Sequence, residues 1–176
     1  VQFWASQNYH LKPDVSIEVL NIRKDENADL SNIKTVQGNA CNLAQFKNNA
    51  FDIVFSNSLI EHLYNKEKQY KMANEAMRVG KHYFIQTPNR HFPIEPHFKF
   101  PFFQYLPDRL KISLQTKTRF INGAKYELEY AQEIIKEIKL LSKREFTSMF
   151  PGSQLYVETF WGLEKSYIVH NFHNNS

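Results

Sequence analysis

The stretch of sequence that decides the fold lies between residues 51 and 63 and reads FDIVFSNSLIEHL. Its first five residues are mostly β-branched or aromatic, which is typical of a buried parallel strand. The apolar run ends at Ser56, Asn57 and Ser58, and a helical pattern follows. In open α/β sheets, ligands bind where the carboxyl end of a strand opens into such a turn. The alternative is a plain connection between core elements without a ligand, because a fold does not fix a function.

Length and composition narrow the class of protein. The chain has 176 residues, 42% of them hydrophobic and 15% aromatic, which suits one domain with a sizeable core. The net charge is +4 and the lysines are scattered, so a solvated charged surface is favoured over a nucleic-acid interface. The single cysteine, Cys41, excludes an intrachain disulfide and favours a cytoplasmic setting. No apolar run approaches the ~20 residues of a membrane span.

The elements around the central stretch predict a mostly parallel sheet. Short apolar runs predict strands over residues 16–22, 33–37, 51–55 and 82–86. Apolar residues at three- and four-residue steps predict a helix over residues 59–79, broken near Asn65, that stops at Gly80. A further partial helix is expected over residues 1–11. Alternation of helices with buried strands indicates an α/β fold.

The second half of the chain is less regular. Residues 90–107 contain four prolines and six aromatic residues and cannot form one regular element. We interpret residues 90–125 as an inserted loop that covers the acceptor pocket, although its phenylalanines could equally belong to the core. Helical spacing returns over residues 126–141, and Ser142 and Glu145 have the spacing of a capping box that starts a helix through Phe150. Residues 155–160 and 164–170 predict a terminal hairpin.

The order of these motifs resembles class I S-adenosylmethionine-dependent methyltransferases of type 11/23. The resemblance rests on Gly38-Asn39-Ala40, residues 51–63, residues 75–81, Thr87-Pro88-Asn89, Phe150-Pro151-Gly152 and residues 161–166. It implies a Rossmann-like three-layer α/β sandwich, with a mostly parallel sheet and a C-terminal antiparallel hairpin. It also implies a single domain over residues 1–176.

Two departures from the family pattern bear on the cofactor. The family's first strand and glycine-rich turn are absent, and none of the five glycines precedes Gly38. Together with Val1 in place of a starting Met, this predicts an N-terminally truncated chain. Two acidic positions are amides: Asn21 stands where the family holds the ribose hydroxyls, and Asn39 where it contacts the adenine. An amide can still accept and donate hydrogen bonds there.

The resemblance implies S-adenosyl-L-methionine as cofactor. Six residues at strand ends are implied to bind it: Asn21, Asn39, Ala40, Ser56, Asn57 and Ser58. The alternative for each is a strand cap or turn residue, because Asn and Ser are common in turns.

His62 is the candidate general base for a hydroxyl acceptor, since its ordinary pKa lies near working pH. Glu61 is expected to orient His62 or to bind a cation, and Glu61, His91 and His97 are assigned to the substrate site. The alternative is a helix N-terminal acid and a histidine that only packs. His91, Glu95 and His97 lack the regular spacing of a metal site, so no metal is expected.

The function hypothesis is S-adenosylmethionine-dependent methyl transfer to a small-molecule or unidentified acceptor. The rival is a degenerate methyltransferase-like fold that acts as a binding or scaffold module, which the two amides and the missing glycine turn favour. A nicotinamide dehydrogenase is the weaker third option, because the chain lacks Gly-x-Gly-x-x-Gly.

Overall fold

The computed structural model describes residues 15–22, 32–94, 97–98, 100–119, 121 and 123–172. The helix expected over residues 1–11 lies outside these residues. Within them, the strands form two sheets. The first contains β1 (Ile17–Asn21) and β2 (Ile33–Gln37). The second has the order β3 (Phe51–Asn57), β4 (Gly80–Pro88), β6 (Leu163–His170) and β5 (Gln154–Phe160).

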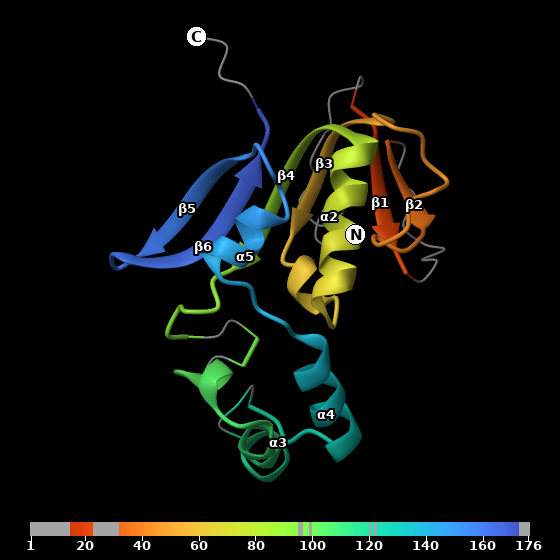
Figure 1. Cartoon of the computed structure of the whole chain (residues 1–176). Coiled ribbons are helices and arrows are strands. Elements are labelled where there is room, and N and C mark those ends of the chain that lie inside the picture. Colours follow the sequence, from red (N-terminus) through yellow and green to blue (C-terminus); the bar gives the residue numbers. More distant parts are fainter. Residues whose placement is uncertain are drawn as a thin grey trace.

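Strand direction follows the expected pattern. β1 and β2 pair in parallel, as do β3 and β4, whereas β6 runs antiparallel to both β4 and β5. The arrows of β1, β2 and β3 point toward the same end of the molecule (Figure 1). The α/β class, the parallel strands and the C-terminal antiparallel hairpin are therefore confirmed. The hairpin turns through Trp161 and Gly162, which have φ values of 51° and 77°.

The break that the sequence predicts near Asn65 separates two helices. The short 3₁₀ helix η1 covers Ile60–His62, and α2 covers Lys66–Val79. Asn65 is the N-cap of α2, and its side chain accepts a hydrogen bond of 2.9 Å from Lys68 N. This cap satisfies a backbone N–H that the first helical turn leaves without a partner.

Helix α5 (Lys143–Ser148) starts with the predicted capping box between Ser142 and Glu145. Together with α2 it covers one face of the four-stranded sheet. The core there consists of buried residues from η1, α2, β4, α5, β6 and the segments flanking α5: Ile60, Met72, Ala73, Ala76, Tyr83, Ile85, Leu141, Phe146, Met149, Phe150, Tyr167 and Val169.

The opposite face of β3 carries exposed apolar side chains. Ile53 and Phe55 are 56% and 64% exposed, and among the described residues β3 pairs only with β4. The described residues therefore supply the sheet and one of the two helical layers expected of a three-layer sandwich.

Gly80 follows α2 as predicted, but it does not end the helix through a left-handed turn. Its φ is −99°, and it is also the first residue of β4. A Cβ atom at this position would lie 2.7 Å from both His82 O and Val54 Cγ2. Glycine is needed here because backbone and side chain approach closely.

The segment between β4 and α4 holds a helix that the prediction missed. Residues 90–107 are irregular except for the 3₁₀ helix η2 (Phe103–Tyr105), but α3 (Asp108–Lys117) follows where a loop was expected. The large apolar residues of α3 are Leu110, Ile112 and Leu114, two residues apart, so helical periodicity is lacking. Helix α4 covers Leu128–Glu137, inside the predicted range.

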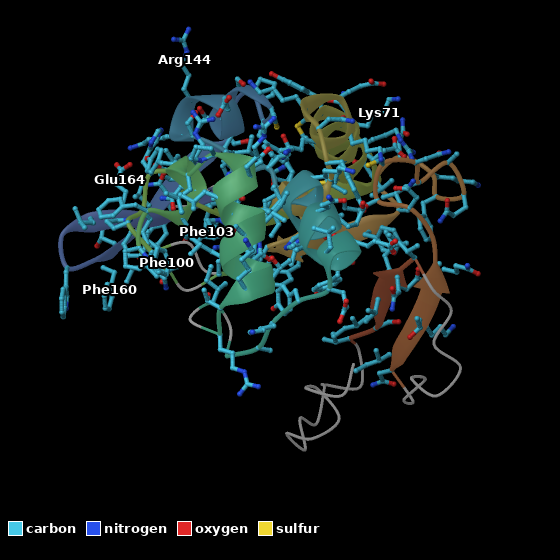
Figure 2. All side chains as sticks on the ribbon, turned by 90° about the horizontal axis from the view of Figure 1, so that it is seen from below. Lys71, Phe100, Phe103, Arg144, Phe160 and Glu164 are labelled. Carbon is cyan, nitrogen blue, oxygen red and sulfur yellow. The ribbon has the colours of Figure 1, made fainter. Side chains whose placement is uncertain are left out.

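The aromatic loop contributes to a second small core as well as to the surface. Phe98, Phe103 and Ile121 are buried together, and the rings of Phe100 and Phe103 lie 6.4 Å apart (Figure 2). Phe102, by contrast, is 58% exposed. Of the helices in the described ranges, none has the length and apolar character that crossing a bilayer requires.

Candidate functional site

The predicted adenosine-binding residues lie at the ends of β1 and β2. Asn21 is the last residue of β1, and its carbonyl accepts a 2.9 Å hydrogen bond from Gly38 N. The Asn39 side chain accepts from Cys41 N at 2.9 Å, across Ala40. The Asn39 amide oxygen thus stabilises its own turn, as the alternative interpretation proposes.

The polar turn after β3 is held by a residue that the sequence analysis missed. Ser58 has a φ of 54°, a left-handed conformation that is uncommon for residues other than glycine. Its backbone N lies 3.2 Å from Gln86 O and 3.1 Å from Gln86 Oε1. Ser56 is buried, and its hydroxyl has no hydrogen-bond partner, whereas Asn57 is exposed. Gln86 gave no signal because it belongs to a strand with no motif of its own.

A cavity of about 430 Å³ opens beside this turn. Its lining comes from β3, β4, β5 and β6: Asn57, Ser58, Phe84, Gln86, Pro88, Glu158, Lys165, Ser166 and Ile168. Glu158 accepts hydrogen bonds from Lys165 Nζ at 2.7 Å and Ser166 Oγ at 2.6 Å. The Lys165 ammonium and the Ser166 hydroxyl lower the pKa of Glu158, so its carboxylate is ionised at neutral pH.

His62 lies in a separate polar cluster. Its Nδ1 lies 2.8 Å from Glu137 Oε1 at the end of α4, and its Nε2 lies 2.9 Å from His97 Nε2 in the aromatic loop. The two imidazole rings are nearly perpendicular, with centroids 4.7 Å apart. The structure thus brings together His62 and His97, which are far apart in the sequence. Glu137 was missed because it reads as an ordinary surface residue of a helix.

Glu61 is completely buried beside this cluster. One carboxyl oxygen, Oε2, accepts from Thr87 Oγ1 at 3.1 Å, while the other, Oε1, has no hydrogen-bond partner. Burial raises the pKa of Glu61. The expectation that Glu61 orients His62 is corrected, because the carboxylate hydrogen-bonded to His62 is Glu137.

The third predicted substrate residue, His91, lies apart from His97. Its Nδ1 lies 2.9 Å from Tyr105 Oη, and its backbone N donates to Asn89 Oδ1 at 2.8 Å. Glu95 lies outside the described residues. Of the residues considered for a metal in the aromatic loop, His91 and His97 therefore have different side-chain partners.

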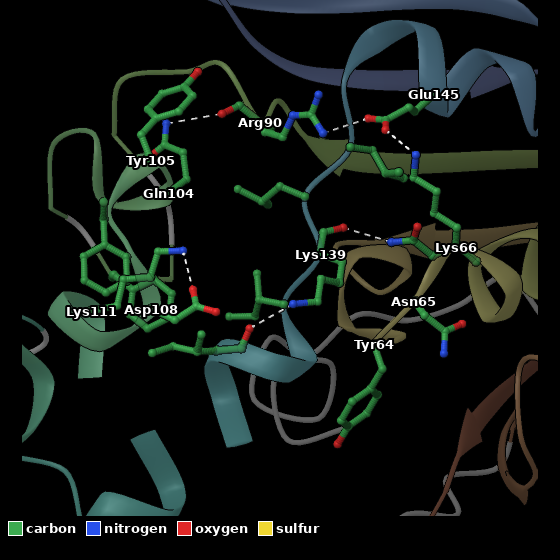
Figure 3. A pocket seen from close by; sticks show the side chains of 17 residues that line it. Tyr64, Asn65, Lys66, Arg90, Gln104, Tyr105, Asp108, Lys111, Lys139 and Glu145 are labelled. Atoms are coloured by element: carbon green, nitrogen blue, oxygen red, sulfur yellow. Dashed lines mark hydrogen bonds and ion pairs between the residues drawn. The ribbon is translucent and has the colours of Figure 1, made fainter. Parts of the chain in front are cut away.

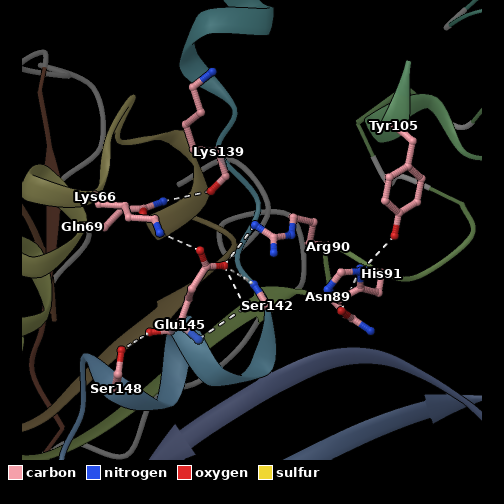
Figure 4. Close-up of polar contacts among 10 residues, drawn as sticks. All are labelled: Lys66, Gln69, Asn89, Arg90, His91, Tyr105, Lys139, Ser142, Glu145 and Ser148. Atoms are coloured by element: carbon pink, nitrogen blue, oxygen red, sulfur yellow. Dashed lines mark hydrogen bonds and ion pairs between the residues drawn. The ribbon is translucent and has the colours of Figure 1, made fainter. Parts of the chain in front are cut away.

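A larger cavity of about 470 Å³ lies between α2, the aromatic loop, α3 and α4 (Figure 3). Its charged lining includes Lys66, Arg90, Lys111, Lys139 and Glu145. Glu145 connects three elements around it: its carboxylate pairs with Lys66 at 2.7 Å and Arg90 at 3.1 Å, and it caps α5 (Figure 4). The predicted site residues do not line this cavity.

The alternation of side chains along β4 separates the 430 Å³ cavity from the polar cluster around His62. Gln86 lines the 430 Å³ cavity, whereas its neighbour Thr87 is buried against Glu61. Successive strand residues point to opposite faces of a sheet. The cavity and the histidine cluster thus begin on opposite faces, although both lie at the carboxyl end of β4.

Residues 4–84 match the protein family described as "Methyltransferase domain". Just under half of the chain is therefore similar to a methyltransferase domain. This match covers the strand-turn-helix stretch at residues 51–63 and confirms the resemblance to class I S-adenosylmethionine-dependent methyltransferases. Methyl transfer is the general chemistry of the family that residues 4–84 match.

The similar curated proteins are two uncharacterized proteins from two strains of Mycobacterium tuberculosis. Each is 36% identical over 53 residues, which is 30% of this chain and 18% of the relative. The matched region therefore spans about a fifth of the length of these relatives.

Two solved structures with a similar backbone are a SAM-dependent methyltransferase from Methanosarcina mazei and a possible histamine N-methyltransferase from Thermotoga maritima. The first has a TM-score of 0.48 and 10% identity, covering 88% of this chain and 80% of that one. The second has a TM-score of 0.46 and 12% identity, covering 79% and 63%.

Proposed function

We propose that the protein binds S-adenosyl-L-methionine at the carboxyl end of β3 and transfers its methyl group to a small-molecule acceptor. The observation that carries this proposal is the 430 Å³ cavity, which is lined by Asn57 and Ser58 at the polar turn after β3. Its other walls offer an aromatic ring, Phe84, and an amide, Gln86. A mostly apolar cavity with a few fixed polar groups is typical of a small-molecule site.

Methyl transfer requires the protein mainly to align the cofactor with the acceptor. In methyl transfer, the acceptor's lone pair forms a bond to the methyl carbon as the carbon–sulfur bond breaks, and the sulfonium becomes a neutral thioether. The cofactor supplies the reactive group, and the protein supplies orientation and a dry site. Gln86 supports this role by fixing the backbone of Ser58. Asn21, Asn39 and Ala40, at the ends of β1 and β2, are proposed to face the nucleoside.

The role of His62 as general base stays a prediction. Its Nδ1 is engaged with Glu137 and its Nε2 with His97. A base needs a nitrogen within hydrogen-bond reach of the acceptor's proton. His97 would therefore have to move away from His62 for this role.

The second candidate function is a non-catalytic binding module with a methyltransferase-like fold. It is favoured by Asn39, whose amide oxygen is already bonded to Cys41 N. Such a module would bind the cofactor weakly or not at all. For either function we propose a cytoplasmic setting, on the ground that the chain has one cysteine.

Calorimetric titration of the protein with S-adenosylhomocysteine tests the proposal. We expect saturable binding, weakened about three- to tenfold by Asn57→Ala, since one net hydrogen bond contributes about 0.5–1.5 kcal/mol. Gln154→Ala is the matched control: Gln154 is exposed at the far end of the hairpin and should leave the affinity unchanged. Absence of binding by the folded protein at about 1 mM ligand would contradict the methyltransferase and support the binding module.

A further inference from the structure

The cluster around His62 has the composition of a metal site. Glu61, His62 and His97 each offer one ligand atom, and these three atoms lie within 4.8 Å of one another. Two imidazole nitrogens and one carboxylate oxygen form a ligand set that first-row transition metals accept, and zinc enzymes use the same set with an open fourth position. Mg²⁺ and Ca²⁺ favour oxygen ligands, which this cluster provides only once.

The hydrogen bonds of His62 prepare it to bind a cation. A carboxylate can only accept, so the His62 Nδ1 that lies 2.8 Å from Glu137 Oε1 carries a proton. In the neutral ring, the lone pair then lies on Nε2, the atom that faces His97. Metal-bound histidines commonly donate their second ring N–H to a carboxylate in this way. Glu137 would therefore fix the tautomer and orientation of His62 without touching the ion.

Glu61 supplies an independent observation that points to a ligand. Its side chain is fully buried, and Oε1 has no hydrogen-bond partner. A buried carboxylate oxygen without a partner is costly, because it loses the hydration that it has in water. A cation between Glu61 and the two imidazoles would remove this cost. Thr87 holds the other oxygen, Oε2, at 3.1 Å.

The spacing allows such an ion after movements of roughly 1 Å. Zn²⁺ binds nitrogen and oxygen ligands at about 2.0–2.2 Å in tetrahedral geometry, so two of its ligand atoms are separated by about 3.4 Å. The largest separation in the cluster, at most 4.8 Å, would have to close by up to about 1.4 Å. The two imidazole nitrogens, now 2.9 Å apart, would have to separate by a few tenths of an ångström.

We propose that Glu61, His62 and His97 bind one divalent transition-metal ion of the zinc type, with Glu137 as the positioning residue of His62. A metal-bound His62 would not be available as the general base, so the two roles of His62 exclude each other. The proposal does not depend on cofactor binding, so its failure would leave the proposed methyl transfer untouched. It departs from the sequence-based expectation of no metal, and it agrees with the alternative in which Glu61 binds a cation.

The test uses the chain without an affinity tag, stripped of metal with a chelator and titrated with Zn²⁺ by calorimetry. Titration with Co²⁺, followed by visible absorption, reports whether nitrogen and oxygen ligands surround the ion. We expect one ion per chain and loss of this binding in His97→Ala. Glu137→Gln should weaken binding about 10- to 100-fold, the usual effect of losing a carboxylate that supports a metal-bound histidine.

His91→Ala is the matched control, because His91 belongs to the same loop but pairs with Tyr105. It should bind Zn²⁺ like the unchanged chain, and circular dichroism should show all variants to be folded. Absence of stoichiometric binding at about 0.1 mM Zn²⁺ would overturn the proposal and leave an ordinary hydrogen bond between the two histidines. Equal binding by His97→Ala and the unchanged chain would also overturn it, because the ion would then lie elsewhere.

Discussion

Replacing Glu145 by glutamine should destabilise the protein at neutral pH and much less in acid. Glu145 accepts from Lys66 at 2.7 Å, from Arg90 at 3.1 Å and from the backbone N of Ser142 at 2.9 Å. It thereby joins α2, the segment after β4 and α5 (Figure 4). These partners, first among them Lys66, lower the pKa of Glu145 from 4.5 to about 2.

The magnitude follows from linkage between protonation and folding. The lowered pKa corresponds to at most about 3 kcal/mol of stability above pH 4.5. Lys66 and Arg90 are 67% and 40% exposed, so water and salt screen both ion pairs. We therefore expect Glu145→Gln to lower the free energy of unfolding by about 1–2 kcal/mol at pH 7.

The sign of the pH dependence is fixed by the direction of the shift. A carboxyl group whose pKa is lower in the folded state stabilises fully above its unfolded pKa and loses this contribution as pH falls. At pH 3 about 40% of the contribution should remain. The difference between the unchanged protein and Glu145→Gln should therefore shrink between pH 4.5 and about 2.

Urea unfolding followed by far-ultraviolet circular dichroism at pH 7 and pH 3 measures this difference. Glu18→Gln is the control, since Glu18 is an exposed acid of β1, and it should change the stability by less than about 0.5 kcal/mol. Equal unfolding midpoints for Glu145→Gln and the unchanged protein at pH 7 would refute the reasoning. So would a difference that stays the same at pH 3.

Three further substitutions test how the fold is held. Gly80→Ala should cost about 1–3 kcal/mol in urea unfolding, because the new Cβ would meet His82 O and Val54 Cγ2 at 2.7 Å; an unchanged midpoint would contradict this. Phe146→Ala should cost about 3–5 kcal/mol, seen as a lower melting temperature, because the ring is fully buried, and a cost below about 1 kcal/mol would mean that this core is loosely packed. Trp161→Asn should raise stability by roughly 0.5–1 kcal/mol, because it places Asn-Gly in a turn where both φ values are positive; a loss would show that the stacking on Phe160 matters more.

Local patterns in the sequence predicted most of the helices and strands. The strand over residues 33–37 has the predicted bounds, the break near Asn65 is present, and Ser142 and Glu145 form the predicted capping box. Each of these features depends on residues within one turn or one strand, so a short window contains the information. Helix α3 was missed because its large apolar residues are spaced two apart, although they lie on a helix.

The candidate site was only partly predictable. The sequence alone predicted that the polar turn after β3, Glu61, His62 and His97 belong to the site. This prediction rested on their residue types and on the family resemblance. The tertiary structure alone decided three contacts of the site. Glu137 and His97 both contact His62, and Gln86 accepts a hydrogen bond from the backbone of Ser58. These contacts join residues 28 to 75 positions apart, and no local periodicity specifies which long-range partners will meet. The long-range partners of His62 are specified only when the aromatic loop and α4 pack against the end of the sheet.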